Sequence, residues 1–211
     1  MGRAKHVQTE LVWRTHGGRR KRAGRPPTGA RSNGRHTKRP SHQPSHPVHV
    51  TMRIASGVQT LRSTRMYPAV REATLCAARR EDFRIVHMSI QRNHVHLIVE
   101  ADSKTALSKG IWGFEISAAK HINAAVGART GKRRKGAVFA GRYHRTTLTT
   151  PRAVRNTIAY VLNNWRHHRE DQSPYTKQWL VDRYASAIYF DGWKERENEL
   201  WCWRRRRGTS R

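Results

Sequence analysis

Two histidines separated by a single residue are the side chains of this sequence that are best placed to bind a metal. His94 and His96 alternate with Val95, Leu97 and Val99. This period of two predicts a β-strand with both imidazoles on one face and the apolar side chains on the other. Two imidazoles so placed can bind one divalent metal and leave coordination positions open for a phosphate. Because the chain has 13 histidines, a chance pair is the alternative, and the central position in a strand favours the metal.

A tyrosine follows on a predicted helix that spans residues 151–168, with Thr150 as its N-cap and Pro151 at its first position. At 100° per residue, three polar side chains lie within about 40° of Tyr160. The opposite side carries the apolar residues. An exposed tyrosine can stack on a base. Beside a metal, a phenol with a pKa near 10 can instead attack as a nucleophile, and Asn164, one turn on, could supply an oxygen ligand. The polar neighbours are Asn156, Asn164 and His167.

The charge of the chain indicates a polyanionic partner. It has 211 residues, a formal net charge of +29 and a sequence pI of about 11.7. Lys and Arg gain affinity for nucleic acid by releasing counterions from phosphates. No apolar run approaches the roughly 20 residues of a membrane span, so no membrane partner is expected. Cys76 and Cys202 alone make neither a disulfide framework nor a four-cysteine zinc site. The expected location is the cytoplasm, with the bacterial nucleoid.

The elements that must position these residues follow from hydrophobic periodicity. Strands are predicted over residues 49–54, 83–90, 93–100 and 137–148, and helices over 67–81, 104–126 and 151–168. The order strand, helix, strand, strand, helix, strand, helix predicts an α+β domain of the ferredoxin-like type. Its antiparallel sheet would carry helices on one face and the tyrosine helix near the other.

Basic segments flank the predicted domain. Residues 1–45 form a basic arm that is expected to be disordered, residues 46–170 the domain, and residues 171–211 a tail with Trp and Arg. The Gly-Arg-Pro element in the arm resembles the core of an AT-hook, which inserts Arg into a narrow minor groove; a generic basic tail is the alternative. The expected DNA contacts are Arg19, Arg20, Arg22, Arg25, Lys132, Arg133, Arg134, Lys135, Arg142, Tyr143 and Arg145. His121, His144 and His168 are either further backbone contacts or partly exposed side chains.

Together these motifs resemble one enzyme family over roughly residues 46–193. The segment 93–99 is similar to the His-hydrophobic-His motif of the HUH endonuclease superfamily, and Tyr160 with Asn164 is similar to the tyrosine helix of its single-tyrosine transposases. Residues 141–145 resemble the arm ahead of that helix in REP-associated members, and residues 182–193 the tail of some chromosomal members. Insertion-sequence members usually have Gln where Asn164 stands, so direct coordination, a water bridge and a purely structural role are all open.

The resemblance implies a metal-dependent enzyme acting on single-stranded DNA beside hairpins. Tyr160 would attack the scissile phosphate and form a 5′-phosphotyrosine, while His94, His96 and Asn164 bind Mg or Mn. Insertion-sequence relatives are usually homodimers and REP-associated ones can act as monomers. Tyr143 is the rival nucleophile, although packing or base stacking suits it better. Two alternatives are a non-catalytic nucleic-acid-binding protein with the same fold and a structural RNA-binding protein of the ribosomal kind.

Overall fold

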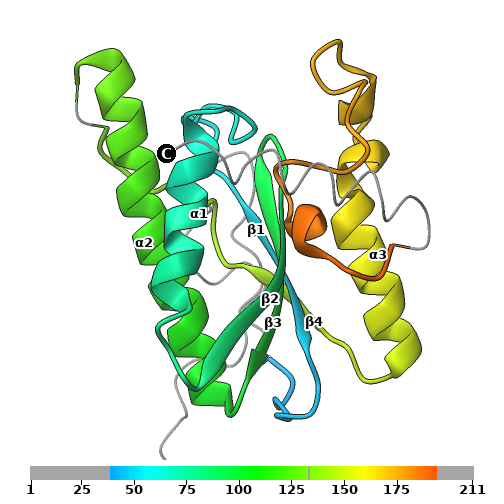
Figure 1. The fold of residues 1–211 in the computed structure, drawn as a ribbon. Helices are drawn as coiled ribbons and strands as arrows, with labels where there is room; N and C mark the ends of the chain where they lie inside the picture. Colours follow the sequence, from blue (N-terminus) through cyan, green and yellow to red (C-terminus); the bar gives the residue numbers. More distant parts are fainter. Residues whose placement is uncertain (1–38, 133, 194–211) are drawn as a thin grey trace, which may run out of the picture. The chain divides into compact units, whose positions relative to one another are not determined.

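The computed structural model describes residues 39–132 and 134–193 of the chain (Figure 1). Within them, four strands form one antiparallel sheet in the order β2-β3-β1-β4. Helices α1 and α2 lie together on one side of this sheet and α3 lies on the other (Figure 1). The predicted ferredoxin-like fold, with the tyrosine helix on its own face, is therefore confirmed. The elements are β1 (Val48–Arg53), α1 (Met66–Ala77), β2 (Phe83–Ile90), β3 (His94–Ala101), α2 (Lys104–Thr130), β4 (His144–Thr147) and α3 (Pro151–His167).

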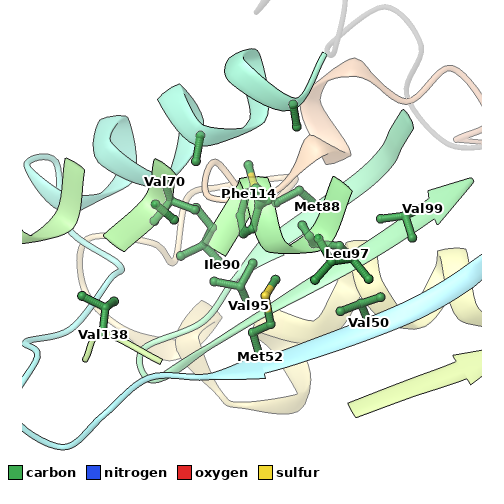
Figure 2. Close-up of a cluster of buried hydrophobic side chains, with 14 of the residues drawn as sticks. Val50, Met52, Val70, Met88, Ile90, Val95, Leu97, Val99, Phe114 and Val138 are labelled. Carbon is green, nitrogen blue, oxygen red and sulfur yellow. The ribbon is translucent and has the colours of Figure 1, made fainter. Parts of the chain in front are cut away.

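The buried core lies between the sheet and the pair α1 and α2. Alternate residues of β1 and β3 point into it, because successive side chains of a strand face opposite ways. The helices contribute Val70 and Phe114 to the same cluster (Figure 2). Gly110 lets α2 approach β2 closely, since a Cβ there would lie 2.2 Å from the ring of Phe83. The side chains left over on β1 and β3 must therefore face α3.

Two helix ends and one strand differ from the sequence prediction. Helix α1 ends at Ala77 instead of residue 81, and α2 continues to Thr130. Gly131, with φ 66°, ends α2 in the left-handed conformation that suits glycine.

None of the described helices combines the length and apolarity needed to cross a membrane.

The predicted strand over residues 137–148 is wrong for most of its length. Only β4, four residues long, belongs to the ladder, and Phe139 forms an isolated bridge to Ile54. Gly141 interrupts this stretch with a φ of 80°, and Gly136 just before it has a φ of 103°. Such φ values are incompatible with a regular strand.

A segment near the end of the described chain pairs with the free edge of β2. We call residues 182–190 the β2 strap. The backbone N–H of Ile90 donates to the carbonyl of Tyr184, and the Ser186 hydroxyl accepts from the N–H of Met88. Asp182 is fully buried and accepts two hydrogen bonds from Arg62, at 2.8 and 2.9 Å. The strap thereby covers an edge that would otherwise expose unpaired backbone groups.

The predicted boundaries of arm, domain and tail stay predictions. Residues 1–38, 133 and 194–211 lie outside the described residues. The predictions that fall on them are the AT-hook-like element, the contacts by Arg19, Arg20, Arg22, Arg25 and Arg133, and the packing of Trp201 and Trp203 onto the domain, for which base stacking is the alternative.

Candidate functional site

The site begins on the face of the sheet that turns away from α1 and α2. In β3, His94 and His96 alternate with residues of the core, as the sequence predicted. In the neighbouring strand β1, Thr51 lies opposite His96 and Arg53 lies opposite His94. His49 lies on the same face of the sheet, two residues before Thr51 in β1. The antiparallel register thus gathers side chains from two strands around the histidine pair.

The surroundings of His96 are enclosed and polar. Its ring centroid lies 4.7 Å from that of His94, and only 4% of the residue is exposed. The Nδ1 atom is 3.0 Å from Nε2 of His49 and 3.2 Å from the hydroxyl of Thr51. The Nε2 atom is buried and has no hydrogen-bond partner in the described structure. One ring nitrogen therefore has hydrogen-bond partners in the protein, and the other has none among the described residues.

Burial keeps these imidazoles uncharged. It lowers the pKa of His94 to about 4, with His168 and Arg53 adding to the shift. It lowers the pKa of His96 to about 3, with help from His94, His49 and His168. Both rings are consequently neutral at pH 7, and a neutral imidazole has a lone pair to donate to a metal.

Helix α3 places Tyr160 next to this pair. The side chain of Thr150 accepts a hydrogen bond from the Ala153 N–H, and Pro151 starts the helix. The apolar side of α3 packs on the sheet through Val161, which contacts Ile98. The ring of Tyr160 lies 5.6 Å from His96, centroid to centroid. It is 43% exposed, so part of this side chain is open to solvent.

The helical wheel suggested that Asn164 lies on a polar, solvated face of α3, but the structure places it elsewhere. It is fully buried, and neither its amide nitrogen nor its amide oxygen has a hydrogen-bond partner in the described structure. The reason is its angle: at roughly 40° from Tyr160 it is turned toward Val161 and Trp165, whereas Asn156 is turned the other way. A buried amide without partners is costly, so this side chain suits a ligand.

Three further residues join the site that the sequence had not assigned to it. His49 and Thr51 contact His96, and the ring of His168 lies 5.1 Å from that of His94. The alternation of His49, Thr51 and Arg53 with core residues was a usable signal. It could not be interpreted without knowing which strand pairs with β3. His168 had been considered only as a DNA contact or a partly exposed histidine.

The side chains of this site can bind a divalent metal only if imidazole nitrogens and an amide oxygen act together as ligands. No three His, Cys, Asp or Glu side chains within residues 39–132 and 134–193 are grouped to hold one. The unpartnered Nε2 of His96 and the unpartnered amide of Asn164 nevertheless supply one nitrogen and one oxygen donor, and His94 can add a second imidazole. Nitrogen and oxygen donors in this number suit Mn²⁺, and suit Mg²⁺ when phosphate oxygens complete the shell.

Tyr143, the rival nucleophile, does not lie at this site. It is half-buried and packs against the core on the side of α1 and α2. The guanidinium of Arg39 lies 3.6 Å from its ring centroid. Its surroundings agree with packing, one of the two roles, packing or base stacking, that the sequence favoured.

The predicted DNA-contacting Lys and Arg residues within the described chain fall into two groups. Arg134 and Arg145 donate hydrogen bonds to protein oxygens: Arg134 to Asn123 and Ala137, Arg145 to Pro40. These two side chains therefore also hold loops together. The exposed group is Lys132, Lys135 and Arg142. Contact of any of these residues with DNA stays a prediction.

Comparison with known proteins places the chain in a family. Among solved structures, it resembles a REP-associated tyrosine transposase bound to a REP hairpin, with a TM-score of 0.54 and 15% identity over 72% of this chain and 82% of that one. A second solved structure, a candidate transposase from Deinococcus radiodurans R1, aligns over 64% of this chain and 98% of its own length at 13% identity. Its TM-score of 0.39 is too low to support an argument. No curated protein matches. A family model described as "Transposase IS200 like" matches residues 42–164, which include His94, His96 and Tyr160. Since this match spans more than half of the 211 residues, the chain belongs to the IS200-like transposase family.

Proposed function

We propose that this transposase nicks and rejoins single-stranded, hairpin-associated DNA, with Tyr160 as the nucleophile and Mg²⁺ or Mn²⁺ as the cofactor. The observation that carries the proposal is the position of Tyr160, partly exposed and 5.6 Å from the ring of His96. The likeness in fold to a REP-associated transposase bound to a REP hairpin supports DNA of this kind as the substrate.

In the nicking step, the Tyr160 oxygen attacks the scissile phosphorus. The bond between phosphorus and the 3′ oxygen breaks, so that the 5′ end stays on the tyrosine as a phosphodiester and the other end leaves as a 3′-hydroxyl once it takes up a proton. The phenol must give up its own proton, and His167, with its ring centroid 6.2 Å from that of Tyr160, can accept it. Attack by a second 3′-hydroxyl on the phosphotyrosine rejoins a strand and frees Tyr160.

The metal would be held by His94 and His96 with the amide oxygen of Asn164. When bound, it supplies positive charge to the oxygens of the scissile phosphate. The two imidazoles are neutral at physiological pH, and the sheet fixes their separation. Asn164 sits on the same helix as Tyr160, so the rigid helix links nucleophile and amide.

Phosphates away from the scissile bond would contact basic side chains. Lys132, Lys135 and Arg142 are exposed, and the residues before Arg39 add more positive charge. Such contacts supply affinity that depends on salt and little on sequence.

Covalent capture on a denaturing gel tests the proposal. Labelled single-stranded hairpin DNA is incubated with Mn²⁺ and the wild type, the Tyr160→Phe variant or the Tyr143→Phe variant. We expect an adduct with the wild type and with Tyr143→Phe, no adduct with Tyr160→Phe, and none after chelation of the metal. Tyr143→Phe is the matched control because it removes one phenol hydroxyl on the opposite side of the sheet.

Two outcomes would contradict the proposal. Tight binding of many hairpins without any adduct would indicate a non-catalytic nucleic-acid-binding protein. An adduct that survives Tyr160→Phe and disappears with Tyr143→Phe would assign the nucleophile to the other face of the sheet.

A further inference from the structure

We propose that His49 is a positioning residue that prepares His96 to bind the metal. Its Nε2 accepts the proton on Nδ1 of His96, and this leaves the lone pair on Nε2 of His96 free for the ion. The inference rests on the proposed function in one respect: it requires that a metal binds at His96.

The hydrogen-bonding pattern of His96 supports this assignment. A neutral imidazole carries one proton, on either nitrogen. Nδ1 has two partners within hydrogen-bonding distance, whereas the buried Nε2 has none in the described structure. Because a buried N–H without an acceptor is unfavourable, the tautomer with the proton on Nδ1 is preferred. That tautomer presents a bare nitrogen at Nε2, as metal coordination requires.

The relative orientation of the two rings fits a hydrogen bond in the ring planes. The planes of His49 and His96 differ by 21°, and their centroids are 5.2 Å apart while the two nitrogens are 3.0 Å apart. Rings that meet nitrogen to nitrogen in nearly one plane point the N–H of one at the lone pair of the other. The register of β1 against β3 fixes this meeting, since His49 and His96 occupy diagonal positions on the same face.

Thr51 is a weaker candidate for the same role. Its hydroxyl is further from Nδ1 of His96, at 3.2 Å. A hydroxyl can also donate as well as accept, so it satisfies either tautomer and selects neither. When His49 carries its own proton on Nδ1, its Nε2 can only accept. In that tautomer His49 determines which nitrogen of His96 stays free.

Metal binding by the full-length protein, measured by titration calorimetry with Mn²⁺ alone, tests the role. Loss of a residue that orients a ligand typically weakens metal affinity about 10- to 100-fold, and we expect this loss for His49→Ala. His49→Gln should recover most of the affinity, because its side-chain oxygen can accept the same proton. His121→Ala, which removes an imidazole from α2 on the other side of the sheet, is the matched control, with an expected change of less than about 3-fold on the same scale.

The tautomer itself can be measured in the metal-free wild type by long-range ¹H–¹⁵N NMR of the His96 ring, which needs no variant. We expect the proton on Nδ1 in the wild type and a mixture of tautomers in His49→Ala. A proton on Nε2 in the wild type, or full Mn²⁺ affinity in His49→Ala, would overturn the role of His49 and leave the proposed function intact. Failure of the wild type to bind Mn²⁺ would instead refute the metal of the proposed function, and with it this inference.

Discussion

At the scale of single residues, His96 shows how an enclosed position prepares a side chain for chemistry. Its neighbours include three histidines that would repel an added positive charge, and burial adds a larger penalty. The unfolded chain has no such penalty, so the ring there titrates near pH 6.5. Between these two pKa values the unfolded state binds a proton that the folded state does not. Acidification must therefore favour unfolding in this range.

This linkage predicts how the stability of the metal-free protein depends on pH. The contribution of His96 is fully present above pH 6.5 and is lost as the pH falls toward 3. Between pH 6.5 and 5, we expect the free energy of unfolding of the wild type to fall by on the order of 1–2 kcal/mol more than that of His96→Gln, which cannot titrate. Urea unfolding at the two pH values measures the difference. Equal losses in both proteins would show that His96 titrates normally in the folded state.

The sequence identified only part of this residue-scale arrangement. The alternation around His94 and His96 predicted their common face, and the helical period brought Tyr160 to the polar side of its helix. The partners His49 and Thr51 could not be found in that way. Their contact with His96 depends on the register between β1 and β3, which is set by packing of the whole sheet and not by local pattern.

At the scale of elements, the contact between α2 and β2 depends on a missing side chain. Gly110 faces the ring of Phe83, which is buried and cannot move aside, while a Cβ added at Gly113 on the same helix would have no neighbour within 4 Å. The sequence predicted helix α2 but did not indicate which glycine was required. Only the distance between helix and sheet distinguishes the two.

Opposite effects are expected when the two glycines are changed to alanine. Gly113→Ala should stabilise the protein by roughly 0.5–1 kcal/mol, because alanine is the better helix former. Gly110→Ala should destabilise it by roughly 1–3 kcal/mol, since the added methyl overpacks the core. Thermal unfolding of the pair measures both effects under identical conditions. Stabilisation by Gly110→Ala would mean that α2 lies further from β2 than the structure shows.

The predicted strand over residues 137–148 failed at the same scale for a physical reason. Alternation of apolar and basic residues is compatible with a strand, but the pattern carries no information on φ. Gly136 and Gly141 adopt positive φ, and the ladder begins only at His144. The period of two is thus a necessary condition for a strand and not a sufficient one.

At the scale of the whole molecule, one buried ion pair joins segments 120 residues apart. Arg62 and Asp182 expose 3% and 0% of their side chains and meet at 2.8 Å. Burial raises the pKa of Asp182 although Arg62 opposes the shift. Arg62 also approaches Glu170, which pairs with Arg92 just before β3. Arg62, between β1 and α1, therefore anchors the β2 strap through Asp182. Glu170 links the turn after α3 to Arg92, in the loop that precedes the histidine strand.

Removal of one partner of the Arg62–Asp182 pair should lower the free energy of unfolding far more than removal of one partner of an ion pair near the surface. Asp182→Ala leaves the buried guanidinium of Arg62 with only the more distant carboxylate of Glu170, at 3.8 Å, and a loss of about 3–5 kcal/mol is expected. Asp82→Ala, which breaks the pair with Arg80, whose two side chains are 34% and 44% exposed, should cost less than about 1 kcal/mol. Chemical unfolding of both variants compares them directly. A similar small loss in both would mean that the strap contributes little to the stability of the domain.

The charge of the whole chain leads to the last prediction. Residues 1–38 contain eleven Lys and Arg and one acid, and their predicted role is to contact phosphates. If three of these side chains each neutralise a phosphate of single-stranded DNA, their loss should lower the slope of log affinity against log salt by about 2, at roughly 0.7 per contact. The full-length variant Arg19→Gln/Arg20→Gln/Arg22→Gln tests this with fluorescence anisotropy between low and physiological salt.

The control is Arg65→Gln/Arg71→Gln/Arg79→Gln, which removes the same charge from exposed positions in and beside α1. This helix lies on the far side of the sheet from Tyr160. We expect the control to keep the slope of the wild type, because its residues would not touch the strand. Equal reductions in the two variants would show that the overall field of the protein, and not the arm, determines the dependence on salt.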